Sequence, residues 1–346
     1  TNWVRDSILR SYLVEQFPDE YGLAIEDFAD GMETGEYQID WSKKIRWNDE
    51  EVRRILEEEM FLPENERLYG EKEFDTREYI YKYQVLDLQA ASAKSSRENG
   101  AVGERDRSGF LTDVEVKIYP DTLTWIHDYA YSFNDPYTKN YFWHPAFDDY
   151  PVVGVNWKQA TAFSHWRTKM MNAYLRKTKQ PTLPDFRLPT ESEWEYAARG
   201  DLDASPYPWG GPYTRNIEGC FLANFKPLRG NYVADGGIKT IKTASYNPNG
   251  YGLYDMAGNV SEWTSNAYDE SAYSYGHDMN ADYFYDAIDS DHPVLKRKAI
   301  RGGSWKDVAY FIQTSTRTFE YQDTAKCYIG FRNVIDFLGR DKKDFQ

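Results

Sequence analysis

The sequence predicts an α+β protein with a low content of regular secondary structure. Helical patterns are confined to the part before about residue 200, and beyond it short aromatic segments alternate with clusters of Gly, Asn, Asp and Pro. The chain contains 29 Tyr, 18 Phe and 11 Trp, and each of these rings can bury on the order of 150–250 Å². Such a composition is typical of a folded protein with a sizeable core and not of a disordered chain.

The N-terminal part is expected to be helical over residues 1–60. Residues 48–51 (Asn-Asp-Glu-Glu) have the form of a capping box, and apolar residues follow at helical spacing. These apolar residues are Val52, Ile55, Leu56 and Met60.

A loop and several strands are expected next. Residues 92–108 contain no apolar period, which predicts a mobile loop. The alternation of residues 114–118 predicts a half-buried strand. Two further aromatic strands are expected between Leu123 and Phe133.

Two helices are predicted in the centre of the chain. Asn156 is a suitable N-cap for a helix over residues 157–176, whose apolar side chains share one face. Residues 190–193 (Thr-Glu-Ser-Glu) form a second capping box, which opens the next helix. The sequence contains no internal repeat.

Charge and cysteine content exclude some functions. A formal net charge of -15 argues against nucleic acid as a partner, because phosphate binding requires clustered Lys and Arg. No apolar run approaches the roughly 18–20 residues of a membrane span. The two cysteines, Cys220 and Cys327, match no metal-site spacing. They can form one disulfide or remain two unrelated buried thiols.

Several segments from residue 150 onward occur in a recognisable order. They are residues 150–157 (YPVVGVNW), 187–200 (RLPTESEWEYAARG), 207–210 (YPWG), 249–263 (NGYGLYDMAGNVSEW), 301–305 (RGGSW) and 329–332 (IGFR). Together they closely resemble the formylglycine-generating-enzyme (sulfatase-modifying factor) family over residues 150–335. The resemblance implies a formylglycine-generating-enzyme-like, C-type-lectin-like fold in which residues 1–346 form one domain. Residues 1–8 resemble the first helix of that family, so residues 10–145 are expected to be a large mixed insertion that contains the 92–108 loop.

The motif residues also have a physical explanation of their own. Arginine is a planar donor group that can join carboxylates and loop carbonyls. We therefore expect a structural and not a catalytic role for the motif arginines, and a core position for the motif tryptophans. These residues are Arg187, Arg199, Arg301 and Arg332, and Trp157, Trp194, Trp209, Trp263 and Trp305.

The residues that would carry the family's oxidase chemistry are missing. In the active enzymes that the sequence resembles, a redox cysteine pair follows the Gly-Gly-Ser-aromatic motif and binds copper, a soft metal that thiolates hold well. By the family spacing, Asp307 and Ile312 stand at these two positions. Neither can supply a thiolate, and Cys327 lies outside both positions. The resemblance thus implies a non-catalytic protein without copper.

Two other functions stay open. One is a cysteine-independent metal enzyme, since related sulfoxide synthases of this superfamily hold iron on histidines. The five histidines of this chain are scattered, however, without an i,i+3 or i,i+4 pair on any predicted helix. They are His127, His144, His165, His277 and His292. The other is a lectin-like ligand-binding module, because the fold resembles C-type lectins.

The resemblance also implies two structural Ca²⁺ sites. The carboxylates of Asp255 and Glu262 and the backbone oxygens of Gly258 and Val260 match the first, and hard oxygen donors suit this ion. Alternatively, the two carboxylates cap turns and pair with arginines. The second set is Asn224, the carbonyl of Phe225, Asp235 and the carbonyl of Gly237.

The segment before the core motifs points to one group inside the family. Residues 135–155 (DPYTKNYFWHPAFDDYPVVGV) and 3–8 (WVRDSI) resemble the gliding-motility lipoproteins of Bacteroidetes, of the GldK (PorK) type with the GldJ type as near alternative. This resemblance implies a structural lipoprotein of the type IX secretion and gliding machinery. It would face the periplasm at the outer membrane, on a lipid anchor upstream of this sequence. A GldN/PorN-like protein would be its partner, and the chain would self-associate into a ring.

Aromatic side chains in the insertion are candidate partner contacts, because Tyr, Trp and Phe are enriched at protein interfaces. The alternative is that they only pack the insertion onto the core. The candidates are Trp125, Tyr129, Tyr131, Tyr141, Phe142 and Trp143. A second aromatic and acidic loop, residues 268–285, is also suited to contact a ligand or partner.

Overall fold

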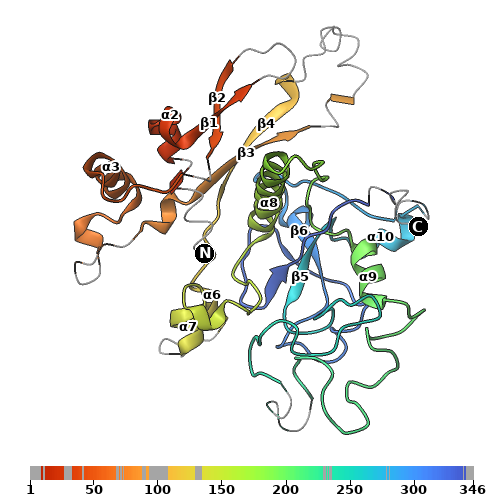
Figure 1. Ribbon diagram of the computed structural model, residues 1–346. Coiled ribbons are helices and arrows are strands. Elements are labelled where there is room, and N and C mark those ends of the chain that lie inside the picture. The colour runs from red at the N-terminus through yellow and green to blue at the C-terminus, as the bar shows by residue number, and fades with distance from the viewer. Residues whose placement is uncertain are drawn as a thin grey trace. The chain divides into compact units, whose positions relative to one another are not determined.

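The computed structural model describes residues 9–10, 12–26, 33–40, 43–67, 70, 72, 74–87, 91–92, 108–128, 135–228, 231, 233, 236–277, 279, 281–337 and 339. The chain divides into two compact units, Thr1–Tyr119 and Pro120–Gln346. Figure 1 labels helices and strands in each of them. The expected 10–145 insertion thus contributes residues to each unit.

The first unit combines short helices with two antiparallel strand pairs. The helices whose bounds the structure describes here are α2 (Pro18–Tyr21), α3 (Glu50–Met60), η1 (Glu64–Glu66), η3 (Thr76–Glu78) and η4 (Ser108–Phe110). Its pairs are β1 (Gly22–Glu26) with β2 (Glu33–Ile39), and β3 (Ile80–Leu86) with β4 (Leu111–Lys117). The core consists of Leu9, Leu13, Val14, Tyr21, Val52, Leu56, Met60 and Tyr79.

The expectation of helix throughout residues 1–60 is wrong, because β1 and β2 interrupt it. The apolar run in β1 is only three residues long, and a run that short has no readable period. Its pairing with β2, where Leu23 faces Gln38, decided the outcome. The helix after residue 48 is present, but Asp49 caps it by accepting a hydrogen bond from the Glu51 N–H at 3.0 Å.

The second unit contains a four-stranded sheet in the order β7-β6-β5-β8. Its strands are β5 (Ser261–Ala267), β6 (Arg297–Arg301), β7 (Thr318–Tyr321) and β8 (Ile329–Phe331). β5 runs parallel to β8, and the other pairs are antiparallel. The helices are α6 (Thr124–Asp128), α7 (Pro136–Asn140), η5 (Pro145–Phe147), α8 (Trp157–Lys177), α9 (Glu191–Arg199), α10 (Ala272–Tyr275) and η6 (Pro293–Lys296).

Capping explains why α8 and α9 begin where the sequence predicts. The Asn156 side chain accepts from the Gln159 N–H at 2.9 Å, and the Gln159 side chain accepts from the Asn156 N–H at 2.9 Å. Thr190 and Glu193 form the same reciprocal pair at α9. Both orphan donors at each helix start are thereby satisfied. The predicted helix over residues 157–176 is confirmed and ends one residue later.

The strands expected between Leu123 and Phe133 are wrong where the structure describes them, because residues 124–128 form α6. The Asp121 carboxylate accepts from the Leu123 N–H at 2.9 Å, and this turn starts the helix. Residues 129–134 lie outside the described part, as do residues 93–107 of the expected loop.

Low regular structure, the predicted fold class, is plain between α9 and β5, where the described residues form no helix or named strand. The sheet is covered by apolar side chains from α8 and from the loop before α9. This cluster consists of Ala160, Leu188, Trp263, Ile300 and Ile329. Among the described helices none is both long and apolar enough to cross a membrane.

Candidate functional site

The loop after β6 contains Asp307 and Ile312, the two positions at which the resemblance leads us to expect cysteines. Gly303 has a φ of 64°, and a Cβ there would lie 2.6 Å from the Phe311 carbonyl oxygen and 2.8 Å from Ile312 Cγ2. Only glycine permits this conformation and approach. Asp307 Oδ2 accepts from the Ser304 N–H at 2.9 Å and from Ser304 Oγ at 2.5 Å. The loop is therefore folded back on itself and closed by a carboxylate.

Ile312 fills the core at the second cysteine position. Its side chain is 0% exposed. It packs in a cluster with Tyr207, Phe221, Ala223, Phe225 and Ala257. One expected cysteine position thus holds a turn-closing carboxylate and the other holds a core side chain, and neither offers a redox or soft-metal donor.

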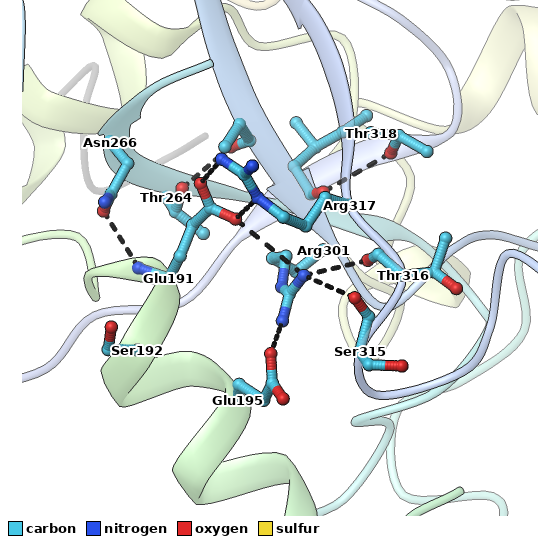
Figure 2. A network of polar contacts seen from close by, with 12 residues as sticks. Glu191, Ser192, Glu195, Thr264, Asn266, Arg301, Ser315, Thr316, Arg317 and Thr318 are labelled. Carbon is cyan, nitrogen blue, oxygen red and sulfur yellow. Dashed lines mark hydrogen bonds and ion pairs between the residues drawn. The ribbon is translucent and has the colours of Figure 1, made fainter. Parts of the chain in front are cut away.

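Two glutamates one turn apart on α9 hold a network of arginines (Figure 2). Glu191 accepts from Arg317 Nε and Nη2, both at 2.6 Å. Glu195 accepts from Arg301 Nη2, and also from Arg199 Nη2 at 2.6 Å. Residues at i and i+4 face the same side of a helix, so α9 positions both carboxylates together.

Arg301 lies at the centre of this network, and its side chain is 0% exposed. Its Nη1 donates to the carbonyls of Ser315 and Thr316 at 3.2 and 3.1 Å, as Figure 2 shows. Within the described residues its Nε has no hydrogen-bond partner. Each carboxylate is already paired with a cation, so the arrangement supports the fold and offers no free acid or base.

The other two motif arginines are also structural. Arg187 donates to Glu193 and to Asp336, both at 2.6 Å. Arg332 donates to Glu262 Oε1 at 2.6 Å and to Oε2 at 2.5 Å. The predicted structural role of the motif arginines is confirmed. Sequence reasoning missed Glu191, although its spacing from Glu195 on a predicted helix was a usable signal.

Glu262, in the first expected calcium set, is a partner of an arginine. Besides Arg332, its Oε2 accepts from Trp194 Nε1 at 2.7 Å. The sequence left open that this carboxylate pairs with an arginine, and in the structure it does so. A carboxylate has about four lone-pair sites, and Oε1 uses one of them here, so a cation could share this oxygen.

Asp255, the second carboxylate of that set, lies in the same loop and accepts from the Ala244 N–H at 2.8 Å. Burial raises its pKa above the usual carboxyl range, and the nearby Glu262 raises it further. The donor set of two carboxylates and two carbonyls fits a hard cation in composition.

In the second expected calcium set, Asn224 joins two loops by hydrogen bonds. Asn224 Nδ2 donates to the Lys239 carbonyl at 2.9 Å, and the Asn224 carbonyl accepts from the Asn259 N–H at 2.8 Å. Phe225 is buried with an exposed fraction of 6%. Gly237 precedes Lys239 by two residues along the chain. Asp235 lies outside the described residues.

Three histidines act as caps of backbone turns. The Nδ1 atoms of His144, His277 and His292 accept from backbone N–H groups two residues further on, at 3.1, 3.1 and 3.3 Å. His165 is half-buried, and desolvation lowers its pKa. The described residues contain no group of three His, Cys, Asp or Glu side chains placed to hold a metal ion.

Both cysteines are free thiols. Cys327 is 0% exposed, and its Sγ lies 2.8 Å from Asp128 Oδ2. Burial and this carboxylate raise the pKa of the Cys327 thiol far above its ordinary value. The sequence left open a disulfide or two separate buried thiols. In the structure the two thiols are separate, and only Cys327 is buried.

The candidate partner contacts separate into core and surface residues. Trp125 and Tyr141 are 0% and 7% exposed, and Trp125 lies 6.1 Å from Trp305 between ring centres. Trp143 is 63% exposed, and Phe142 is half-buried. Trp125 and Tyr141 therefore pack in the core, which was the alternative to partner contact. The remaining candidates, Tyr129 and Tyr131, lie outside the described residues.

A cavity of about 220 Å³ lies beside the Ile312 cluster. Trp209 and Phe221 line it and belong to or pack against that cluster. Its other lining groups come mainly from residues 245–249. The volume is below the roughly 300 Å³ at which ligand pockets usually begin.

Sequence comparison relates the chain to active and inactive proteins. The "Inactive C-alpha-formylglycine-generating enzyme 2" of Bos taurus is 34% identical over 190 residues, which are 53% of this chain and 50% of that protein. The "Formylglycine-generating enzyme" of Streptomyces coelicolor is 31% identical over 193 residues, which are 54% and 53%. The chain spans about half the length of these curated relatives.

Among solved structures, "Treponema denticola variable protein 1" is similar with a TM-score of 0.38 and 26% identity, over 54% of this chain and 71% of that one. Residues 102–337 match the family model of the sulfatase-modifying factor enzyme 1-like domain. That match covers more than half of the chain, includes every motif from residue 150 onward, and starts before the predicted core. The chain belongs to the formylglycine-generating-enzyme, or sulfatase-modifying factor, family.

Proposed function

We propose that this chain is a non-catalytic, structural member of its family. The observation that carries the proposal is the loop after β6, where Asp307 closes a turn and Ile312 is buried in the core. Neither side chain can bind copper as a thiolate or be oxidised as a cysteine pair. The similarity to a protein named as inactive supports the same conclusion.

A direct assay tests the absence of oxidase activity. The purified chain is incubated with Cu(I), oxygen and a cysteine-containing sulfatase peptide, with the Streptomyces coelicolor enzyme as positive control. We expect no aldehyde on the peptide by mass spectrometry and no stoichiometric copper after desalting. Aldehyde formation above the protein-free control would contradict the proposal.

We further propose that the chain is a lipoprotein component of the type IX secretion and gliding machinery. In this proposal it joins a GldN/PorN-like partner in a periplasmic ring at the outer membrane. The resemblance of residues 135–155 to gliding-motility lipoproteins supports it. So does Trp143, which this segment presents to solvent with 63% exposure, because exposed tryptophans are frequent interface hot spots.

Co-purification with a GldN/PorN-like protein, followed by light scattering, tests the partner. We expect a complex larger than a one-to-one pair for the unmodified chain, and at least about tenfold weaker association for Trp143→Ala. Tyr213→Ala is the matched control, since Tyr213 is 77% exposed but lies outside the resembling segment. If the chain does not bind the partner, or if both variants weaken binding equally, this assignment is wrong.

We also propose a structural Ca²⁺ ion at Asp255, Glu262 and the carbonyls of Gly258 and Val260. The ion would join a loop that contains no helix or strand to the start of β5. Adding Ca²⁺ to EDTA-treated protein is expected to raise Tm, and Asp255→Asn is expected to abolish that rise. A Tm that is insensitive to Ca²⁺ would exclude the site.

A further inference from the structure

The charge of the chain is unevenly distributed along its sequence. Residues 1–119 contain 28 Asp and Glu against 16 Lys and Arg, an excess of 12 negative charges. Residues 150–184 contain six Lys and Arg and no Asp or Glu. This second segment includes the whole of α8, so one helix of an acidic protein carries only positive side-chain charge.

The positive charges gather at the C-terminal end of α8. Lys169, Arg176, Lys177 and Lys179 are all exposed, and none of them forms an ion pair with a carboxylate of the described residues. The helix dipole favours Arg176 and Lys177 in the last turn, but its effect does not reach Lys169. Lys169 and Arg176 are seven positions apart, so they share one face and lie about 10.5 Å apart along the helix axis. We call these four residues the basic end of α8.

The N-terminal unit offers an acidic helix with the same spacing. α3 contains five Glu and two Arg, and its apolar side belongs to the core of that unit. Glu51 and Glu58 are exposed and, among the side chains that the structure describes, pair with no Lys or Arg. They too are seven positions apart, so their carboxylates are spaced along α3 as Lys169 and Arg176 are along α8.

We propose that the basic end of α8 docks against α3 of a second copy of this chain. With the two helices antiparallel, Lys169 faces Glu58 and Arg176 faces Glu51, and both pairs form at once because the spacing matches. The two surfaces are different, so the contact is head to tail, and each added copy leaves one surface of each kind free for the next. The proposal rests on the self-association proposed above and names its two surfaces.

Local pairing can overcome the negative net charge that two copies share. At physiological salt the screening length is about 8 Å, so charges that lie further apart contribute little. Side chains that form ion pairs lie well within this range. Because each exposed ion pair contributes only a small free energy, we expect a weak contact that added salt weakens further.

Charge reversal on each surface of the whole chain tests the proposal. The variants are Lys169→Glu/Arg176→Glu and Glu51→Lys/Glu58→Lys, and sedimentation velocity at low salt measures self-association. Each variant alone should self-associate at least about tenfold more weakly than the unmodified chain, because like charges then meet. An equimolar mixture should associate again, since the reversed charges of one variant meet opposite charges on the other. Both variants keep a negative net charge, so general attraction between them cannot produce this result.

A control variant and the partner protein make the result specific. Lys226→Glu/Lys242→Glu makes the same change of net charge at two exposed lysines outside α8 and should associate as the unmodified chain does. Reversal variants that associate normally, a mixture that stays monomeric, or an unmodified chain that stays monomeric at low salt would each overturn the proposal. If the mixture stays monomeric while each variant still binds the GldN/PorN-like partner, only the docking surfaces are wrong and the partner assignment holds. Thermal unfolding checks that each variant is folded.

Discussion

Single side chains decide the chemistry that this chain can perform. A buried isoleucine and a turn-closing aspartate stand at the two positions where the resemblance leads us to expect cysteines, and the buried thiol of Cys327 lies elsewhere. Cys327 is enclosed by aromatic side chains of its own cluster, with Trp125 and Trp305 among them. A thiol reacts as its thiolate, so burial that raises the pKa suppresses its reactivity.

The two cysteines are therefore expected to differ in reactivity. In the native protein at neutral pH, a thiol reagent such as DTNB should modify Cys220, which is partly exposed, and leave Cys327 unmodified. Both cysteines should react with DTNB in denaturant. The folded Cys220→Ser variant should show almost no reaction with DTNB. Two rapidly reacting native thiols, or a disulfide found by mass spectrometry, would contradict the structure.

At the scale of elements, the first turn of α9 combines a local capping box with an ion pair to a residue outside the helix. Thr190 and Glu193 close the capping box, and the same Glu193 carboxylate pairs with Arg187. The hydrogen bond from Arg187 is the main cause that lowers the pKa of Glu193, and burial opposes it. The carboxylate therefore contributes stability above its ordinary pKa, and this contribution is lost as the pH falls through the lowered value.

Replacing Glu193 by Gln should show this pH dependence. Gln keeps the capping box but cannot form the ion pair. We expect Glu193→Gln to have a lower Tm than the unmodified protein at pH 7, with the difference shrinking as the pH falls below the ordinary carboxyl range and the carboxylate becomes protonated. Glu218→Gln, at an exposed site, serves as control. A difference that grows as the pH falls would show that the sign is wrong.

The buried network on α9 should be more sensitive. Glu191→Gln leaves Arg317 without its carboxylate beside the fully buried Arg301. Breaking a buried pair by removing one partner typically costs about 3–5 kcal/mol, and we expect a loss near the lower end because Arg317 is partly exposed. Urea unfolding measures it.

The exposed pair Lys82–Glu115, at 2.9 Å, provides the comparison. Glu115→Gln should change the free energy of unfolding far less than Glu191→Gln does, because an exposed ion pair contributes little. In a double-mutant cycle, Glu191→Gln combined with Arg317→Met should cost less than the sum of the single changes. Additive losses would argue against a coupled pair.

At the scale of the whole molecule, two units with separate cores make up the chain. The core cluster of the first unit draws only on residues before 120, and the four clusters of the second draw only on residues after it. The four-stranded sheet, the capping boxes at Asn156 and Thr190, and the motifs from residue 150 onward lie in the second unit. A domain that contains its own core can in principle fold alone.

The fragment 120–346 is accordingly expected to fold by itself. Its urea transition should be single and cooperative, and Cys327 should remain protected from DTNB as in the full chain. Circular dichroism in the near ultraviolet reports whether its tryptophans are packed. A fragment with exposed Cys327 and no cooperative transition would show that the first unit is needed for folding.

Local signals made much of the second unit predictable. Asn156 and Thr190 act on backbone groups within three residues, so the starts of α8 and α9 could be predicted from sequence. The order of the motifs identified the family, and the planar donors of arginine indicated structural roles for Arg187 and Arg332. Low regular structure followed from the density of Gly, Asn, Asp and Pro after residue 200.

Tertiary structure decided what depends on distant residues. Pairing with β2 made β1 a strand, and a turn at Asp121 gave α6 instead of an extended segment. The sequence alone could not tell that Trp125 is buried while Trp143 is exposed, or that Glu262 has Arg332 as its partner across 70 positions. Caps and turns act over a few residues, whereas strand pairing, burial and ion pairs form only when the folded chain brings separate segments together.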